Sequence, residues 1–229
     1  MLLRQLFDPD TSTYTYLIAD EATRRAAIID PVREHAERDL QLLRELGLTL
    51  RYVLETHVHA DHVTSAGPLS DITGAETVVG VRGAACGNVR VAHGDVLQLG
   101  ETTIEVLETP GHTDDSLSFR VGDHVFTGDC LLVRGTGRAD FQNGDANALY
   151  DSITNVLFAL PDHTTVWPGH DYRGQTCSTI AEERQHNPRI AGRSREAFVA
   201  IMDNLQLAPP RHIQEAVPAN RACGRASLP

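Results

Sequence analysis

Four side chains of metal-binding type lie close together in the segment Thr56–His62. They are His57, His59, Asp61 and His62. Imidazole and carboxylate groups suit zinc or iron, and a set without cysteine disfavours a thiolate site. A solvated loop could carry four such residues by chance, but this concentration favours a metal centre.

Three further residues of the same type each follow a glycine at the end of an apolar stretch: His112, Asp129 and His170. Taken singly, each is an ordinary turn, because Gly-His and Gly-Asp pairs are common in loops. Together with the first segment, these repeated units indicate loops gathered at one edge of a sheet, where small residues let the backbone approach closely. The sequence therefore predicts a metal site built from several loops.

Short strands and helices alternate along the chain, and the candidate ligands follow the strands. Apolar alternation predicts the strands, helical spacing of leucines predicts the helices, and Gly122-Asp123 predicts a hairpin turn. The predicted strands are 2–7, 14–19, 26–30, 52–56, 76–79, 103–107, 117–120, 124–127 and 165–167, and the predicted helices are 34–46, 145–160, 178–186 and 195–205. Because no linker, low-complexity tract or repeat interrupts this pattern, one α/β domain over residues 1–229 is expected.

Composition and charge argue against several functions. The chain is 41% hydrophobic and 22% charged, and its formal net charge of −11 disfavours a nucleic-acid partner or an anionic membrane surface. It lacks a run of about eighteen apolar residues, and its first residues do not resemble a signal peptide, so a cytoplasmic protein is expected. Four widely spaced cysteines without a C-x-x-C pair predict free thiols in a reducing compartment.

The order of the ligand-type residues resembles that of the metallo-β-lactamase superfamily. Its pattern, H-x-H-x-D-H followed by a histidine, an aspartate and a final histidine, is matched by His57, His59, Asp61, His62, His112, Asp129 and His170. The resemblance implies an α/β fold, the αβ/βα four-layer sandwich of the metallo-β-lactamase type, with the metal site at one edge of two packed sheets. It specifies the fold better than the reaction, because hydrolases, nucleases and oxidoreductases share this scaffold.

A narrower resemblance is to the persulfide dioxygenases, the family of the ethylmalonic-encephalopathy protein. It implies one iron(II) per chain, held by His57, His112 and Asp129 as the catalytic centre. Two histidines and one carboxylate leave positions open for substrate and dioxygen, whereas zinc has no redox chemistry. Thr136 departs from the cysteine of several relatives but is no expected ligand. The matching segments are 128–142 (GDCLLVRGTGRADFQ), 170–174 (HDYRG), 182–189 (EERQHNPR) and 217–220 (VPAN).

The same resemblance assigns supporting roles to the other matched residues. His59, Asp61, His62 and His170 would surround the ligands and orient them and bound water, or would only hold the loops through hydrogen bonds. Substrate contacts are predicted for residues whose side chains bind carboxylates: Arg138, Arg134, Tyr172 and Arg173. Any one of these is more often a solvated surface group, and Arg138 is preferred because it lies in the segment that follows Asp129.

The expected reaction is the oxidation of glutathione persulfide by O2 and water to sulfite and glutathione, with a homodimer as one expectation for the assembly. The alternative is a glyoxalase II-like thioester hydrolase with a binuclear metal centre that generates hydroxide. All seven ligand-type residues for two metals are present, so the ligand set alone leaves this alternative open. A non-catalytic metal-binding or interaction module is disfavoured by so complete a set. Metal count together with oxygen uptake would separate the three.

Overall fold

The computed structural model describes residues 1–208 and 212–225, and the chain divides into two compact units. The first unit contains residues 1–91 and 96–104 together with the C-terminal segment, and the second contains residues 92–95 and 105–208. The expectation of one domain over the whole chain stays a prediction.

The first unit is built on a mixed sheet of six strands in chain order: β1 (Leu2–Asp8), β2 (Thr13–Ala19), β3 (Arg25–Ile29), β4 (Thr49–Leu54), β5 (Glu76–Gly80) and β6 (Val89–Val91). β1, β2 and β3 pair antiparallel, whereas β3 to β6 run parallel. Parallel strands end at the same edge of a sheet, where crevices and sites form. Asp30 and the segment Thr56–His62 therefore follow the same edge.

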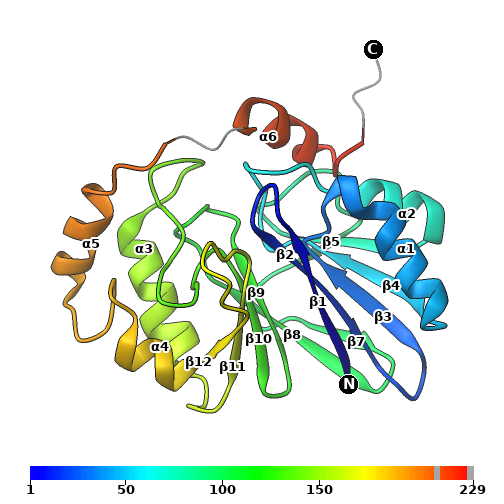
Figure 1. Ribbon diagram of the computed structural model, residues 1–229, viewed down its shortest axis with the longest axis horizontal. Coiled ribbons are helices and arrows are strands. Elements are labelled where there is room, and N and C mark those ends of the chain that lie inside the picture. The colour runs from blue at the N-terminus through cyan, green and yellow to red at the C-terminus, as the bar shows by residue number, and fades with distance from the viewer. Residues whose placement is uncertain (209–211, 226–229) are drawn as a thin grey trace. The chain divides into compact units, whose positions relative to one another are not determined.

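The helices of this unit are α1 (Ala36–Glu45), preceded by the turn η1 (Arg33–His35), α2 (Ala66–Thr73) and α6 (Ile213–Arg221). α1 contributes Leu40 and Leu43 to an apolar core that also includes alternate residues of β2 and β3 and residues of β4 and α2. Alternate residues share a face because the side chains of a strand have a period of two. Figure 1 shows α1 and α2 side by side.

A second mixed sheet has the strand order β12-β11-β10-β9-β8-β7. Its strands are β7 (Val96–Leu99), β8 (Thr102–Glu108), β9 (Leu117–Val121), β10 (His124–Gly128), β11 (Thr165–Pro168) and β12 (Ser178–Thr179). β10 and β11 are parallel, whereas the pairs β8–β9, β9–β10 and β11–β12 are antiparallel. Because β10 and β11 are parallel neighbours, Asp129 and His170 follow the same edge of this sheet.

The helical segments of the second unit are α3 (Ala146–Asp151), which continues into η2 (Ser152–Val156) and η3 (Leu157–Ala159), α4 (Ile180–His186) and α5 (Arg195–Asp203). Asp145 caps the N-terminus of α3, and Thr179 caps that of α4, where a reciprocal bond with Glu182 forms a capping box. Leu149 and Phe198 belong to the apolar core that these helices form with the sheet. α3 and α5 lie side by side (Figure 1).

The predicted strands and helices are confirmed, with ends shifted by a few residues, and so is the Gly122-Asp123 hairpin between β9 and β10. α2 and α6 were missed, because Gly67, Pro68 and Pro218 weaken the local helix signal. Strands β6, β7 and β12 are too short to show a period. No helix among the described residues is long and apolar enough to cross a membrane.

The prediction of four free thiols was wrong. Cys86 and Cys223 form a disulfide within the first unit, while Cys130 is buried and Cys177 is exposed as free thiols. The bonded cysteines are 137 residues apart, and only the return of the C-terminal segment to the first unit brings them together. No local spacing pattern could have indicated this pairing.

Candidate metal centre

The segment after β4 presents His57 and is held by Asp30 at the end of β3. The backbone N–H of Thr56 donates to Oδ1 of Asp30 (2.7 Å), and its hydroxyl donates to Oδ2 (2.8 Å). The hydroxyl oxygen also lies 2.9 Å from Nδ1 of His57. Because the single hydroxyl proton goes to Asp30, Nδ1 of His57 donates in this contact. Nε2 then carries the lone pair that a metal requires.

His59 is buried beside His57 against two carboxylates. Its Nε2 lies 3.1 Å from Oδ1 of Asp30 and 3.5 Å from Oε2 of Glu55. Burial lowers the pKa of His59, but the charges of Asp30 and Glu55 outweigh it, and the pKa is raised well above the ordinary value. The ring centres of His57 and His59 are 4.1 Å apart. His59 therefore lies against the ring of His57 and beside Asp30, the residue that holds Thr56. Its role in orienting a metal ligand stays a prediction.

Asp61 and His62 are bonded to each other. Nδ1 of His62 lies 2.9 Å from Oδ2 of Asp61, which also accepts a bond from the hydroxyl of Thr13 (3.1 Å). His62 is buried, and its Nε2 has no hydrogen-bond partner among the described residues. An unsatisfied buried polar group costs about 1–3 kcal/mol. After Nε2 of His57, this nitrogen is therefore the second in the unit that is placed to interact with a metal ion or a water molecule.

In the second unit, His112 and Asp129 face each other, with Nε2 of His112 at 3.6 Å from Oδ2 of Asp129. Nδ1 of His112 lies 2.7 Å from the carbonyl oxygen of Arg138. A carbonyl only accepts, so Nδ1 donates and Nε2 carries the lone pair. Nδ1 of His170 lies 2.6 Å from Oδ1 of Asp129 and holds that oxygen. The 3.6 Å spacing is close to the roughly 3–3.5 Å expected for two ligands bound about 2.1 Å from one ion.

Two glycines allow the backbone to pass these side chains at close range. A Cβ atom at Gly137 would lie 2.8 Å from Nδ1 of His112, and one at Gly169 would lie 2.7 Å from Oδ1 of Asp129. Both distances are too short for real contacts, so any larger residue would displace a candidate ligand. The predicted close approach is confirmed at Gly169, whereas Gly137 was not singled out from the sequence.

Two of the predicted substrate-binding arginines are bonded within the protein. Arg138 donates to both carboxylate oxygens of Asp140 (2.6 and 2.7 Å) and to the carbonyl of Ala208 (2.7 Å). Arg134 forms an ion pair with Glu183, which is fully buried. These contacts occupy guanidinium N–H groups that would otherwise be able to bind a substrate carboxylate. The substrate role of both arginines stays a prediction.

Tyr172 and Arg173 project from the loop that follows His170. The ring of Tyr172 is stacked on that of His170, with 6.0 Å between centres and 7° between planes, and the residue is 73% exposed. Arg173 is exposed, and its guanidinium has no hydrogen bond or ion pair with a described residue. Both predicted residues therefore present polar groups to solvent beside a residue that touches Asp129.

Sequence reasoning missed Arg189. Its guanidinium donates to the carbonyl and the hydroxyl of Thr136 (2.6 and 3.0 Å), and no described carboxylate pairs with it. Burial, and to a smaller extent the positive charge of Arg173, lower the pKa of Arg189. Arg189 lies in the segment 182–189, which resembles the persulfide dioxygenases, and this was the one indication in the sequence. The neighbouring residues do not distinguish it from a surface arginine.

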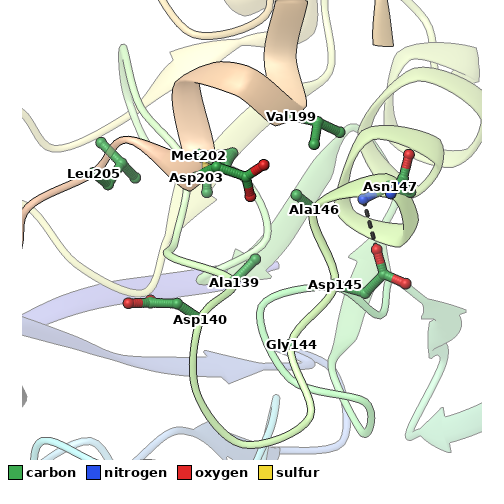
Figure 2. Close-up of a pocket in the computed structure, with 10 residues that line it drawn as sticks. All are labelled: Ala139, Asp140, Gly144, Asp145, Ala146, Asn147, Val199, Met202, Asp203 and Leu205. Carbon is green, nitrogen blue, oxygen red and sulfur yellow. Dashed lines mark hydrogen bonds between the residues drawn. The ribbon is translucent and has the colours of Figure 1, made fainter. Parts of the chain in front are cut away.

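A separate pocket of about 510 Å³ lies in the second unit between α3, α5 and the loop that precedes α3. Figure 2 shows its lining, which includes Asp140, Asp145 and Asp203. Asp145 accepts a bond from the backbone N–H of Asn147 (2.7 Å), and Asp140 is paired with Arg138. None of the predicted metal ligands lines this pocket, so it is not the candidate metal centre.

Comparison with known proteins agrees with these observations. The model of the metallo-β-lactamase superfamily matches residues 8–85 and 88–170. Persulfide dioxygenase ETHE1, mitochondrial, from Bos taurus is 47% identical over 98% of this chain and 89% of its own length, and the Homo sapiens protein of that name gives the same values. The crystal structure of ETHE1 from Myxococcus xanthus has a TM-score of 0.97 and 62% identity, covering 98% of this chain and 100% of that one.

The two mixed sheets with flanking helices match the fold of the Myxococcus xanthus protein, which confirms the predicted fold class. Oriented imidazoles and carboxylates in both units fit a metal cofactor. The chain therefore belongs to the metallo-β-lactamase superfamily and, within it, to the persulfide dioxygenases.

Proposed function

We propose that this enzyme is iron(II)-dependent and converts glutathione persulfide, O2 and water into glutathione and sulfite. The observation that supports this best is the fixed orientation of two imidazoles: Nδ1 donates in both His57 and His112, so each offers Nε2 as a ligand atom. With Asp129 they make the two-histidine, one-carboxylate set of non-haem iron oxygenases. We infer that His57 of the first unit joins His112 and Asp129 of the second on one iron per chain.

When bound, iron(II) would supply the redox chemistry that these side chains lack. The overall reaction balances: the persulfide as a whole loses four electrons, because its terminal sulfur loses five and its inner sulfur gains one when the S–S bond breaks, and O2 gains four. Sulfite takes two oxygen atoms from O2 and one from water, while glutathione leaves as a thiol and two protons are released. In this scheme Thr56 with Asp30 orients His57, and His170 holds one oxygen of Asp129 so that the other faces His112.

We infer further that Arg173 and Arg189 anchor the carboxylates of glutathione persulfide. The substrate is anionic and the chain has a net charge of −11, so binding needs a local cationic group. Arg173 is exposed close to His170, and Arg189 is partly buried, with the neutral Thr136 as the hydrogen-bond partner of its guanidinium among the described residues. A partly buried guanidinium without a counter-ion is well suited to a charge-assisted bond with a carboxylate.

Replacing Arg173 by Ala is expected to raise KM for glutathione persulfide about tenfold, near the low end of the cost of a hydrogen bond to a charged group, because Arg173 is exposed. Iron content should stay unchanged. A small persulfide without carboxylates should be oxidised with nearly the KM of the unmodified enzyme. Steady-state kinetics with both substrates measures this, and Arg120→Ala, at a surface ion pair with Glu105, is the matched control. Equal losses with both substrates would argue against an anchoring role.

The reaction itself can be tested with anaerobically iron-loaded protein in an oxygen electrode. We expect O2 uptake on addition of glutathione persulfide and one sulfite formed per O2 consumed, with about one iron per chain. Zinc-loaded protein should show neither, because zinc cannot change its oxidation state. Iron-loaded protein that consumed no O2 would contradict the proposal.

A binuclear thioester hydrolase of the glyoxalase II type is the second candidate. It is favoured by the cluster His59, Asp61 and His62, whose donor atoms lie within 4.8 Å of one another, and by the buried Nε2 of His62. Against it, His62 is bonded to Asp61, and His59 lies against Asp30. Two metals per chain with cleavage of a glutathione thioester and no O2 uptake would establish the hydrolase.

Other expectations stay predictions. The Bos taurus and Homo sapiens relatives are named mitochondrial, so a cytoplasmic location is not established by them. Neither the homodimer nor the lack of a nucleic-acid partner is tested by the structure of a single chain. Size-exclusion chromatography with light scattering would determine the oligomeric state.

A further inference from the structure

The side chain of Asn220, near the end of α6, is hydrogen-bonded to the backbone of the segment that contains the candidate ligand His57. Its Nδ2 donates to the carbonyl oxygens of His59 (2.9 Å) and His62 (2.8 Å). Its Oδ1 accepts a bond from the backbone N–H of Thr64 (2.8 Å). Asn220 is buried, and its three bonds account for both amide hydrogens and the oxygen. One residue thus fixes both the middle and the end of the histidine segment.

The chain immediately after Asn220 is attached to the same unit at several points. Cys223 forms the disulfide with Cys86, and its carbonyl accepts a bond from the backbone N–H of Gly67 (2.7 Å). Gly224 passes so close to Thr64 that a Cβ atom would lie 1.8 Å from the Thr64 carbonyl oxygen. The disulfide therefore holds the C-terminal end of α6 where Asn220 meets the histidine segment.

The helix α6 itself, as distinct from the chain that follows it, buries few side chains. Ala216 and Asn220 are its only buried residues in the described part of the helix. The ion pairs of Glu215 with Arg33 and, just beyond the helix, of Arg225 with Asp71 are exposed at the surface, where such pairs contribute about 0–1 kcal/mol. A helix with so few buried apolar contacts is of the kind that opens locally, unless a covalent bond restrains it.

We propose that Asn220 is a positioning residue for the metal ligands and that the Cys86–Cys223 disulfide makes its action redox-dependent. This inference rests on the proposed metal site. With the disulfide closed, Asn220 holds the histidine segment and metal binding is tight. With the disulfide open, α6 separates from the histidine segment more often. The carbonyls of His59 and His62 then lose the hydrogen bonds from Asn220, and metal affinity falls.

The switch needs a thiol reductant, and the exposure of the two sulfurs indicates the order of events. Cys86 is half-buried and Cys223 is 1% exposed, so a small thiol reaches the sulfur of Cys86 first. Attack there forms a mixed disulfide at Cys86 and releases Cys223, which takes up the proton of the attacking thiol. A second thiol then frees Cys86. Two small thiols are oxidised to one disulfide, and the protein gains two electrons and two protons.

The test compares oxidised and reduced protein by titration with Co(II) alone, whose d–d absorption reports binding, after anaerobic removal of the reductant. Reduction should weaken Co(II) binding about tenfold to a hundredfold, the range seen when support of a metal ligand is lost. Asn220→Asp keeps the acceptor for Thr64 but loses both donors, and it should weaken binding to a similar extent even with the disulfide closed. The Cys86→Ser/Cys223→Ser variant should bind weakly in both redox conditions.

The matched control is Cys130→Ser/Cys177→Ser, which retains the disulfide but lacks the two free thiols. Its redox response should equal that of the unmodified protein. Hydrogen exchange of metal-free protein gives a second readout: residues 56–64 should exchange faster after reduction, while residues 117–128 of the second unit should not change. This readout does not depend on metal binding. It therefore distinguishes a failure of Asn220 and the disulfide to hold the histidine segment from a failure of the proposed metal site. Unchanged exchange at 56–64, or faster exchange with unchanged Co(II) affinity, would overturn the proposal.

Discussion

Replacing His112 by Ala is expected to remove most of the bound iron and to reduce persulfide oxidation by more than the roughly 10–100-fold loss typical of residues that only support metal ligands. The reason is geometric: Nδ1 of His112 is committed to the carbonyl of Arg138, and Nε2 faces Oδ2 of Asp129. His57→Ala and Asp129→Ala should behave alike, and iron analysis alongside O2 uptake would measure both effects.

His163→Ala is the control for the His112 variant, because this histidine also lies in the second unit but its side chain is 68% exposed and pairs with the exposed Asp123. It should keep full iron content and activity. Circular dichroism should show that His112→Ala retains its secondary structure. Two tightly bound zinc ions per chain with full activity would contradict the mononuclear iron site.

Arg134→Met is expected to destabilise the protein by about 3–5 kcal/mol, the usual cost of removing one partner of a buried ion pair. Glu183 is fully buried, and among the described residues the other donors to its carboxylate are neutral: the backbone N–H of Arg134 and the amide of Asn187. Methionine fills a similar volume but leaves the carboxylate without a counter-ion. The free energy of unfolding from urea denaturation would measure the loss.

Two comparisons make the Arg134 result specific. Adding Glu183→Gln to Arg134→Met should recover part of the stability, because the amide carries no charge to be compensated. Arg120→Met removes a surface ion pair with Glu105 and should cost less than about 1 kcal/mol. If Arg134→Met left the unfolding free energy unchanged but raised KM, Arg134 would be a substrate contact, as the sequence suggested.

Much of the fold was readable from the sequence because the signals are local. The periods of the leucines in α1 and of the apolar residues in β2 and β3 reflect which face of each element is buried, and the structure confirms those elements. α2 and α6 escaped because glycine and proline weaken a helix locally, while tertiary packing compensates. Local preference and final structure differ where packing decides.

By itself the sequence determined the types and order of the candidate ligands, since His57, His112 and Asp129 each belong to a short motif that local chemistry makes recognisable. Only the tertiary structure decided how these side chains are oriented and which charges are already paired. Thr56 fixes the tautomer of His57 through Asp30, and Asn220 reaches residues 156 to 161 positions away in the chain. Packing between distant segments determines these partners, so they cannot be predicted from the spacing of residues along the chain.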